Sequence, residues 1–394
     1  MKRFRRSDMR FLSLTLLAVL FVAAPLPCQK TAPKEAKDDS AVVKGELGKM
    51  LEKTFLQKKH YPPEGPSGIV LVAKGGEILL AKGYGVFDEK KQLPMRADSI
   101  WDWASVSKQW TAAAILKLEM QKKIGVDWPL TKVYAEAPKD KAGVTIKHLL
   151  DHTSGIQHDP DFRALGVNPF DRDAVVRAIL ALPMRSAPGS KWEYSNVAYF
   201  LLGAVIEKVS GKSYESYMID EIFRPAGMKD ASIIGDPSLD LKRVPNDKRG
   251  QSAPFAYGPK LSWGYRGAGA VMASARDVVA WDRALRGKKL LSEEAKKKLF
   301  APGANDYALG WFVKKEGDRT AASHTGAVGE IKTGPRTGSR SSRSADIRVG
   351  ARTIRFTRSG SRGTAGRWHR RPKRRDNRSR RRYGSCSIHR VSES

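Results

Sequence analysis

Cysteine is scarce in this chain of 394 residues, which contains only Cys28 and Cys386. Both stand near the ends of the sequence, so we expect no disulfide inside the body of the fold. No C-x-x-C pair occurs, and the seven histidines show no metal-ligand spacing such as H-E-x-x-H. These absences exclude the common zinc and redox motifs, and we expect neither a metal nor another cofactor.

The sequence also lacks an apolar run long enough to cross a membrane. The run from Phe11 to Ala24 has 14 residues, whereas a membrane-spanning helix needs about 20. Lys2, Arg3, Arg5 and Arg6 form a basic segment before this run, and small residues and prolines follow it, which is typical of an export signal. We predict that residues 1–28 form a signal peptide and that the protein is exported, periplasmic or extracellular. The alternatives are an uncleaved anchor and a lipid anchor on Cys28, so any membrane contact is expected only there.

Acidic residues are few, with 41 Asp and Glu against 72 Lys and Arg and a net charge of +31. The excess is concentrated in residues 332–394, which contain 18 Arg and 2 Lys but only 3 acids, and of which 12 are apolar. Such a composition cannot build the packed face of a strand or helix. The body keeps a small positive excess, which is weak evidence for an anionic partner. We expect no nucleic acid to bind the body.

The change of composition at residue 332 has two interpretations. One is a natural basic tail that binds nucleic acid or another anion, with an affinity that falls steeply as salt is added. The other is a reading-frame error that has replaced the C-terminus. The second is favoured because the change directly follows a motif described below. We expect residues 332–394 to be disordered and the chain as written to be poorly stable or inactive.

Between these flanks, strand and helix patterns alternate. A polar leader covers residues 29–42, and a domain is predicted over 43–331 with a helical, loop-rich region over about 127–259. The predicted helices cover 41–57, 105–121, 197–210 and 271–286, and the predicted strands cover 67–73, 78–85 and 307–313. This order predicts an α/β (α+β) fold in which an antiparallel sheet is flanked by helices and carries an inserted helical region.

An S-x-x-K motif, Ser105-Val106-Ser107-Lys108, begins one predicted helix. Residues i and i+3 share a helix face, so the hydroxyl of Ser105 and the amine of Lys108 can meet. A serine is a weak nucleophile until a base takes its proton, and a lysine can be that base if its pKa is lowered. The alternative is that Ser105 caps the helix and Lys108 is solvated.

Two shorter motifs follow in the order Y-x-N and H-x-G. Tyr194-Ser195-Asn196 precedes the helix over 197–210, so its tyrosine could relay a proton and its asparagine could hold a substrate amide. Alternatively, Ser195 or Asn196 caps that helix and Tyr194 packs. In His324-Thr325-Gly326, a glycine on a strand would let a substrate backbone lie close. Each motif alone is weak evidence for a function, and the order in which the three occur strengthens that evidence.

The three motifs and the text between them resemble the class C β-lactamase and penicillin-binding-protein family of serine hydrolases. The resemblance spans roughly residues 47–330 and includes esterase-like, D-amino-acid-peptidase-like and protease-like members. The segments between the motifs that are similar to the family's own are 144–156, 188–196, 222–229 and 267–274. The resemblance implies a β-lactamase-like fold, but the family's last strands are missing from this sequence pattern after Gly329. Their loss would expose a sheet edge.

The resemblance also implies roles for individual residues. Ser105 would attack a carbonyl and form an acyl-enzyme, with Lys108 and Tyr194 moving the proton. Asn196, His324, Thr325 and Gly326 would bind the substrate, and the N–H groups of Ser105 and Ala327 would form the oxyanion hole. His152 and other residues of the similar segments are interpreted as structural.

The substrate implied is a small molecule or peptide: a β-lactam, an ester or a D-amino-acid peptide. His324 departs from the lysine of classical β-lactamases, and a neutral histidine attracts a substrate carboxylate less well. β-Lactam hydrolysis therefore becomes less favoured, and ester or peptide hydrolysis more so. Two alternatives remain open: a catalytically impaired relative that binds or senses its ligand, and anion or nucleic-acid binding through the basic tail.

Overall fold

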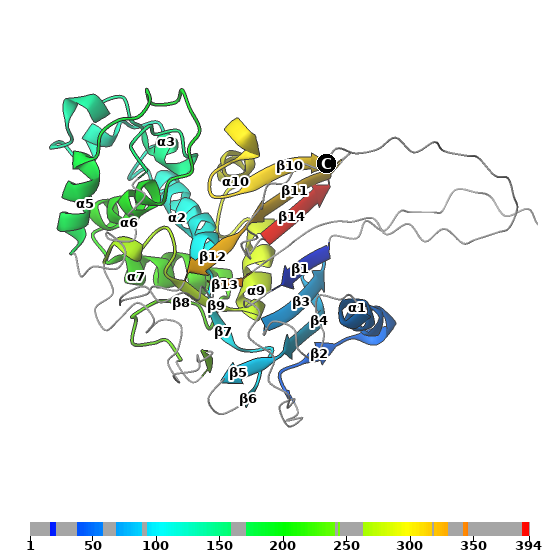
Figure 1. The fold of residues 1–394 in the computed structure, drawn as a ribbon. Coiled ribbons are helices and arrows are strands. Elements are labelled where there is room, and N and C mark those ends of the chain that lie inside the picture. Colours follow the sequence, from blue (N-terminus) through cyan, green and yellow to red (C-terminus); the bar gives the residue numbers. More distant parts are fainter. Residues whose placement is uncertain are drawn as a thin grey trace, which may run out of the picture.

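The structure, a computed structural model, describes residues 16–20, 38–57, 68–88, 93–158, 171–240, 243–244, 263–316, 319–329, 342–345 and 388–393. Figure 1 shows a region of small antiparallel sheets beside a helical region. This arrangement confirms the expected mixture of antiparallel sheet and helices. Most of the polar leader, much of the basic tail and both cysteines lie outside the described residues. The domain boundaries and the export signal therefore stay predictions.

The largest sheet is built on the predicted hairpin. Strands β3 (Gly68–Lys74) and β4 (Glu77–Tyr84) pair antiparallel, and β1 (Leu16–Leu20) and β2 (Val42–Val43) complete the order β1-β3-β4-β2. The turn needs its two glycines, because Gly75 and Gly76 have φ angles of 58° and 80°. Strand β1 comes from the segment that we interpret as an export signal.

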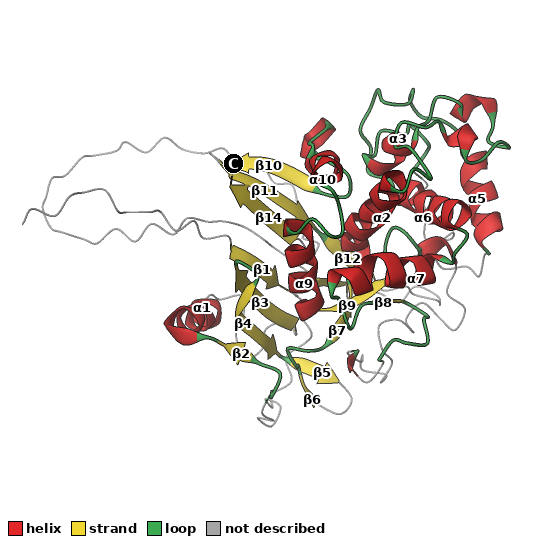
Figure 2. Cartoon of the chain, turned by 180° about the vertical axis from the view of Figure 1, so that it is seen from behind, coloured by secondary structure: helices red, strands yellow, loops and turns green. Residues whose placement is uncertain are grey.

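Strand β3 is buried on both faces, which explains its nearly continuous apolar sequence. Successive side chains of a strand point to opposite faces. Ile69 and Leu71 accordingly join the main core, whereas Val70 and Val72 form a second cluster. Helix α1 (Gly45–Gln57) packs on β4, and α9 (Ala275–Arg286) packs on β3 and β4. Figure 2 shows the sheet between these two helices.

A second sheet has the order β10-β11-β14, with β10 at Phe312–Glu316, β11 at Arg319–His324 and β14 at Ile388–Glu393. Strands β12 (Gly326–Gly329) and β13 (Ser342–Ala345) form a separate pair. Strands β13 and β14 are two short segments of the basic tail, whose disorder stays a prediction. Their ladders use backbone groups, which every non-proline residue carries, so an open edge can pair with a segment of unsuitable composition. Strand β14 also contacts β1 (Figure 1).

A third sheet, β7-β9-β8, leads into the S-x-x-K segment, and a short pair, β5 (Val86–Asp88) and β6 (Leu93–Pro94), lies apart from it. The strands of this third sheet are β7 at Ile100–Asp102, β8 at Ser232–Ile233 and β9 at Val271–Ser274. Strand β9 corrects the prediction of one helix over 271–286. The helix begins only after Ser274, whose side chain forms a capping box with Asp277.

The helical region surrounds α2 (Lys108–Met120), nearly all of whose residues are buried. Helix α6 (Asn196–Ser210) packs against it and ends as predicted at Gly211, which has a φ of 72°. An aromatic cluster of Trp103, Trp110 and Trp281 joins α2 to α9. The remaining helices are α3 (Ile146–Leu150), α5 (Arg172–Ala181), α7 (Tyr214–Tyr217), α8 (Arg224–Ala226) and α10 (Glu293–Phe300).

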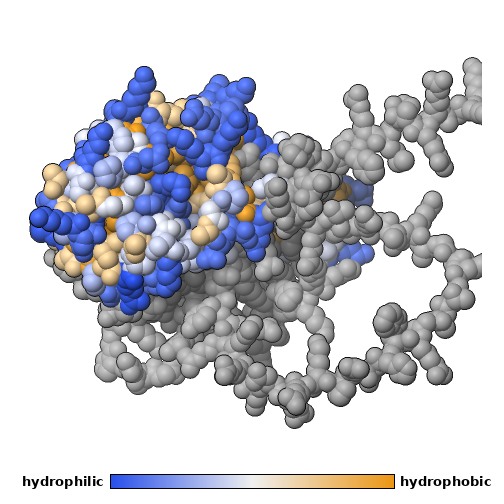
Figure 3. All heavy atoms as spheres, turned by 90° about the horizontal axis from the view of Figure 1, so that it is seen from above, coloured by the Kyte–Doolittle hydropathy of each residue, from blue (hydrophilic) through white to orange (hydrophobic). Residues whose placement is uncertain are grey.

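The described surface carries few large apolar side chains. On the face shown in Figure 3, hydrophilic residues predominate and apolar ones are interspersed. The exposed large hydrophobic residues of the described part are Val43, Met50, Leu93 and Met120. Within the described ranges, no helix combines the length and apolar character needed to cross a bilayer.

Candidate functional site

Ser105 lies on a single 3-10 turn, Ala104–Ser107, between β7 and α2. The predicted helix therefore begins three residues later than expected, at Lys108. The change keeps Ser105 and Lys108 on one side, because side chains at i and i+3 eclipse in a 3-10 helix. Ala104 has a φ of 45°, and its N–H donates to Asp102 Oδ1 at 2.7 Å. This strained backbone places the partly exposed Ser105 at the rim of a buried site.

Lys108 is fully buried, with 0% of its surface exposed. Its Nζ donates hydrogen bonds to Asn196 Oδ1 at 2.7 Å and to the Ala268 carbonyl at 3.0 Å. Both partners are uncharged, and burial holds the pKa of Lys108 well below its ordinary value. A neutral amine has two N–H donors and one lone pair. In that form, the two acceptors would use both donors of Lys108 and leave its lone pair available to accept a proton.

The Y-x-N motif lies at the start of α6 and contacts Lys108. Ser195 is the N-cap of that helix, because its Oγ accepts the Ala198 N–H at 3.2 Å. The capping alternative therefore applies to Ser195 alone. Asn196 contacts Lys108 directly, and Lys108 Nζ lies 4.9 Å from the centroid of the Tyr194 ring. Burial raises the pKa of Tyr194, while a hydrogen bond to the Ser105 side chain lowers it, so the net shift is upward and the phenol stays protonated.

The H-x-G motif lies at the junction of β11 and β12, against the turn that carries Ser105. A Cβ atom added at Gly326 would stand 2.5 Å from the Trp103 carbonyl oxygen and 3.3 Å from the Ser105 nitrogen. Only a glycine leaves room for this approach. The backbone of β12 therefore runs close to the Ser105 N–H, and the N–H of Ala327 follows Gly326 in the same strand.

His324 is buried, with 1% of its surface exposed, and both of its ring nitrogens have partners. Nδ1 lies 2.7 Å from the Thr325 carbonyl, to which it must donate, so Nε2 accepts from the Tyr307 hydroxyl at 3.1 Å. Burial is the largest of the effects that lower the pKa of His324 to about 3. His324 is therefore neutral near pH 7, and neither nitrogen has a free N–H to offer a substrate.

Sequence reasoning missed two aromatic neighbours of the site and one histidine contact. Tyr307 holds His324, and Lys108 Nζ lies 5.4 Å from the centroid of the Tyr199 ring. His152 packs against Tyr194, with ring centroids 4.4 Å apart. These residues come from separate segments with no shared spacing, so one sequence contains no signal that groups them. Of these residues, only His152 lies in a segment, 144–156, that resembles the family's own.

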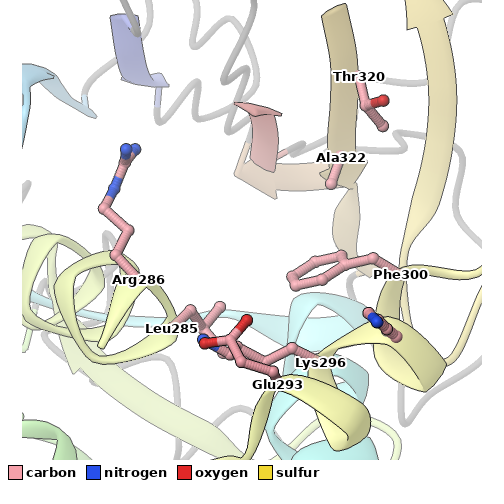
Figure 4. A pocket seen from close by; sticks show the side chains of 8 residues that line it. Leu285, Arg286, Glu293, Lys296, Phe300, Thr320 and Ala322 are labelled. Atoms are coloured by element: carbon pink, nitrogen blue, oxygen red, sulfur yellow. The ribbon is translucent and has the colours of Figure 1, made fainter. Parts of the chain in front are cut away.

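Other polar clusters of the described part do not form a second centre of this kind. Among the residues that the structure describes, no three His, Cys, Asp or Glu side chains gather as a metal site would require. A separate cavity of about 380 Å³ lies between α9, α10 and β11 (Figure 4). None of the predicted site residues lines it; its lining residues are Leu285, Arg286, Glu293, Lys296, Lys297, Phe300, Thr320 and Ala322.

Comparisons with known proteins show the family and the fold of the chain. The sequence model of the Beta-lactamase family matches residues 61–339. A Bacillus subtilis relative, "Putative penicillin-binding protein PbpX", is 30% identical over 73% of this chain and 74% of its own length. A penicillin-binding protein structure from Bacillus halodurans is 26% identical with a TM-score of 0.56, covering 66% of this chain and 85% of that one.

A penicillin-binding protein homologue from Pyrococcus abyssi shares the fold, with 24% identity and a TM-score of 0.60 over 73% of this chain and 69% of that one. The S-x-x-K, Y-x-N and H-x-G motifs all lie within the part of the chain that matches the family model. The chain therefore belongs to the Beta-lactamase family, whose members are serine hydrolases.

Proposed function

We propose that this chain hydrolyses an amide or ester through an acyl-enzyme on Ser105. The observation that carries the proposal is the setting of Lys108: it is fully buried, its Nζ donates only to uncharged groups, and burial holds its pKa well below the ordinary value. A lysine held in this way is suited to act as a general base at neutral pH. A lysine exposed to water would be protonated at neutral pH and could not act as a general base.

In the proposed reaction, Ser105 Oγ attacks the substrate carbonyl carbon and its proton passes to Lys108, either directly or through the hydroxyl of Tyr194. The N–H groups of Ser105 and Ala327 receive the oxyanion that forms. The same proton is then given to the leaving nitrogen or oxygen as the scissile bond breaks. Water repeats the sequence on the acyl-enzyme and releases the acid. Asn196 orients both Lys108 and the substrate amide.

The substrate proposed is uncharged on its leaving-group side. His324 and Thr325 border that side, as the resemblance to β-lactamases implies, and His324 has neither a charge nor a free donor. A carboxylate that enters such a site loses its hydration without gaining a cation. Classical β-lactams and peptides with a free C-terminus carry such a carboxylate, whereas simple esters and peptide amides do not.

A matched pair of substrates tests this proposal. We expect N-acetyl-D-alanyl-D-alanine amide to be cleaved with a kcat/KM about tenfold or more above that of the corresponding free acid, because a missing hydrogen bond to a charged group costs about 1.5–3 kcal/mol. Both reactions are followed by mass spectrometry. 4-Nitrophenyl butyrate and nitrocefin extend the comparison to a neutral ester and an anionic β-lactam.

The Ser105→Ala variant is the control, and it should abolish cleavage of every substrate. Faster cleavage of the free acid would contradict the proposed substrate class. Acylation of Ser105 that stops after one turnover would instead identify a binding or sensing relative. Hydrolysis that survives in Ser105→Ala would contradict the acyl-enzyme itself.

A further inference from the structure

His152 occupies an unusual position beside the site. It follows α3 and has a left-handed backbone with a φ of 62°, which non-glycine residues rarely adopt. Its side chain is 1% exposed. The ring lies among three tyrosines, with centroids 4.4 Å from Tyr194, 4.6 Å from Tyr307 and 5.2 Å from Tyr199. The backbone is therefore strained at a residue that touches the rings around Lys108.

The polar contacts of His152 hold Tyr194 from both sides along the chain. Its carbonyl accepts the N–H of Glu193 at 2.8 Å. Its Nδ1 accepts the N–H of Ser195 at 3.1 Å. Glu193 and Ser195 are the residues before and after Tyr194, so His152 fixes the backbone on each side of the phenol while its ring packs at a tilt against the phenol itself. Ser195 also begins α6, and Asn196 is the next residue.

The other ring nitrogen shows that packing alone does not account for this imidazole. Because Nδ1 accepts a hydrogen bond, the proton of the neutral ring is on Nε2. That atom is buried and has no hydrogen-bond partner among the described residues. A buried donor without a partner costs free energy, which an apolar ring of similar size would avoid. The acceptor at Nδ1 is what an apolar ring could not supply.

We propose that His152 is a positioning residue for the acylation step, an inference that rests on the proposed function. Its Nδ1 and its ring fix the loop 193–196 so that the Tyr194 hydroxyl stays on Ser105 and the Asn196 amide stays on Lys108. It touches neither the substrate nor Ser105. Its loss should therefore lower the rate of acylation more than it weakens substrate binding.

Two variants of the full chain separate the acceptor from the ring. His152→Phe keeps an aromatic ring and removes the acceptor. His152→Asn removes the ring but places an amide oxygen near the position of Nδ1, and asparagine tolerates a positive φ. The measurements are kcat and KM for 4-nitrophenyl butyrate, the rate at which a fluorophosphonate labels Ser105, and the thermal midpoint of unfolding.

We expect His152→Phe to lower kcat and the labelling rate on the order of 10²-fold, as a misplacement of about 1 Å can, with KM within about threefold of the parent. We expect His152→Asn to have a kcat and a labelling rate at least about tenfold above those of His152→Phe. This order should hold even if His152→Asn has the lower thermal midpoint. A phenylalanine variant that labels at the parental rate would overturn the inference alone. The inference would also be overturned if the labelling rates of the two variants fell in proportion to their thermal midpoints. A parent chain that no fluorophosphonate labels would overturn the proposed function, and this inference with it.

Discussion

Replacement of Lys108 by methionine is expected to lower kcat/KM by about 10³-fold, within the range that a general base contributes. Methionine has nearly the same length and removes only the amine. The loss follows because, among the described residues, the two hydrogen-bond partners of Nζ are an amide oxygen and a backbone carbonyl, neither of which can replace the amine as a base. The measurement is hydrolysis of 4-nitrophenyl butyrate by parent and variant.

Lys117→Met is the matched control for this experiment. Lys117 lies on the same helix, α2, but its Nζ faces Glu221 at 3.7 Å on the partly exposed side, away from Asn196. Its loss should leave kcat/KM within about twofold of the parent, since surface ion pairs contribute little. Equal losses in the two variants, or full activity in Lys108→Met, would show that the buried amine is not the base.

Replacement of Gly326 by alanine is expected to lower kcat/KM at least about 10²-fold, the loss seen when one oxyanion donor is removed. The obstacle is contact, because the new Cβ would meet the Trp103 carbonyl at 2.5 Å and the Ala104 side chain at 3.2 Å. Neither is the end of a flexible side chain, so strand β12 must move away from the turn that carries Ser105. The Ala327 N–H moves with that strand.

Gly287→Ala is the control for a simple effect of losing a glycine. Gly287 follows α9 with a φ of −78°, and the nearest atom to an added Cβ would be 3.5 Å away. This variant should match the parent in both kcat/KM and thermal midpoint. A Gly326→Ala variant that retains more than about half of the parental kcat/KM would show that the approach of β12 to Ser105 does not matter for catalysis.

The parts of the fold that could be predicted from the sequence are those set by local pattern. The β3–β4 hairpin and the end of α6 at Gly211 follow from turn and cap chemistry that neighbouring residues determine. The segment over 271–274 forms a strand although its apolar residues continue the helical period, and the capping box at Ser274 marks where the helix begins. The pairing of β11 with β14 could not be predicted, since it is a long-range backbone contact without a side-chain pattern.

The candidate site also contains parts that could be predicted from the sequence and parts that could not. Ser105 and Lys108 are one helical turn apart, so their meeting could be expected from spacing alone. That Tyr194 and Asn196 meet them followed from a family resemblance and not from spacing, because 88 residues separate Lys108 from Asn196. The neutral state of His324 depends chiefly on its burial, and its ring is held by Tyr307; the sequence alone shows neither feature. The roles of these residues stay predictions that the experiments above test.

The pH dependence of Ser105 labelling tests the central claim, that Lys108 is a neutral base in the resting site. The base acts only when unprotonated, so labelling by a fluorophosphonate rises with pH through the pKa of Lys108 and is constant above it. Burial holds that pKa well below the ordinary lysine value of 10.5. We predict that the rate, measured by mass spectrometry of the Ser105 peptide, reaches its plateau well below pH 10.5, where an ordinary lysine is still mostly protonated. A rate that keeps rising about tenfold per pH unit up to pH 10 would contradict the account.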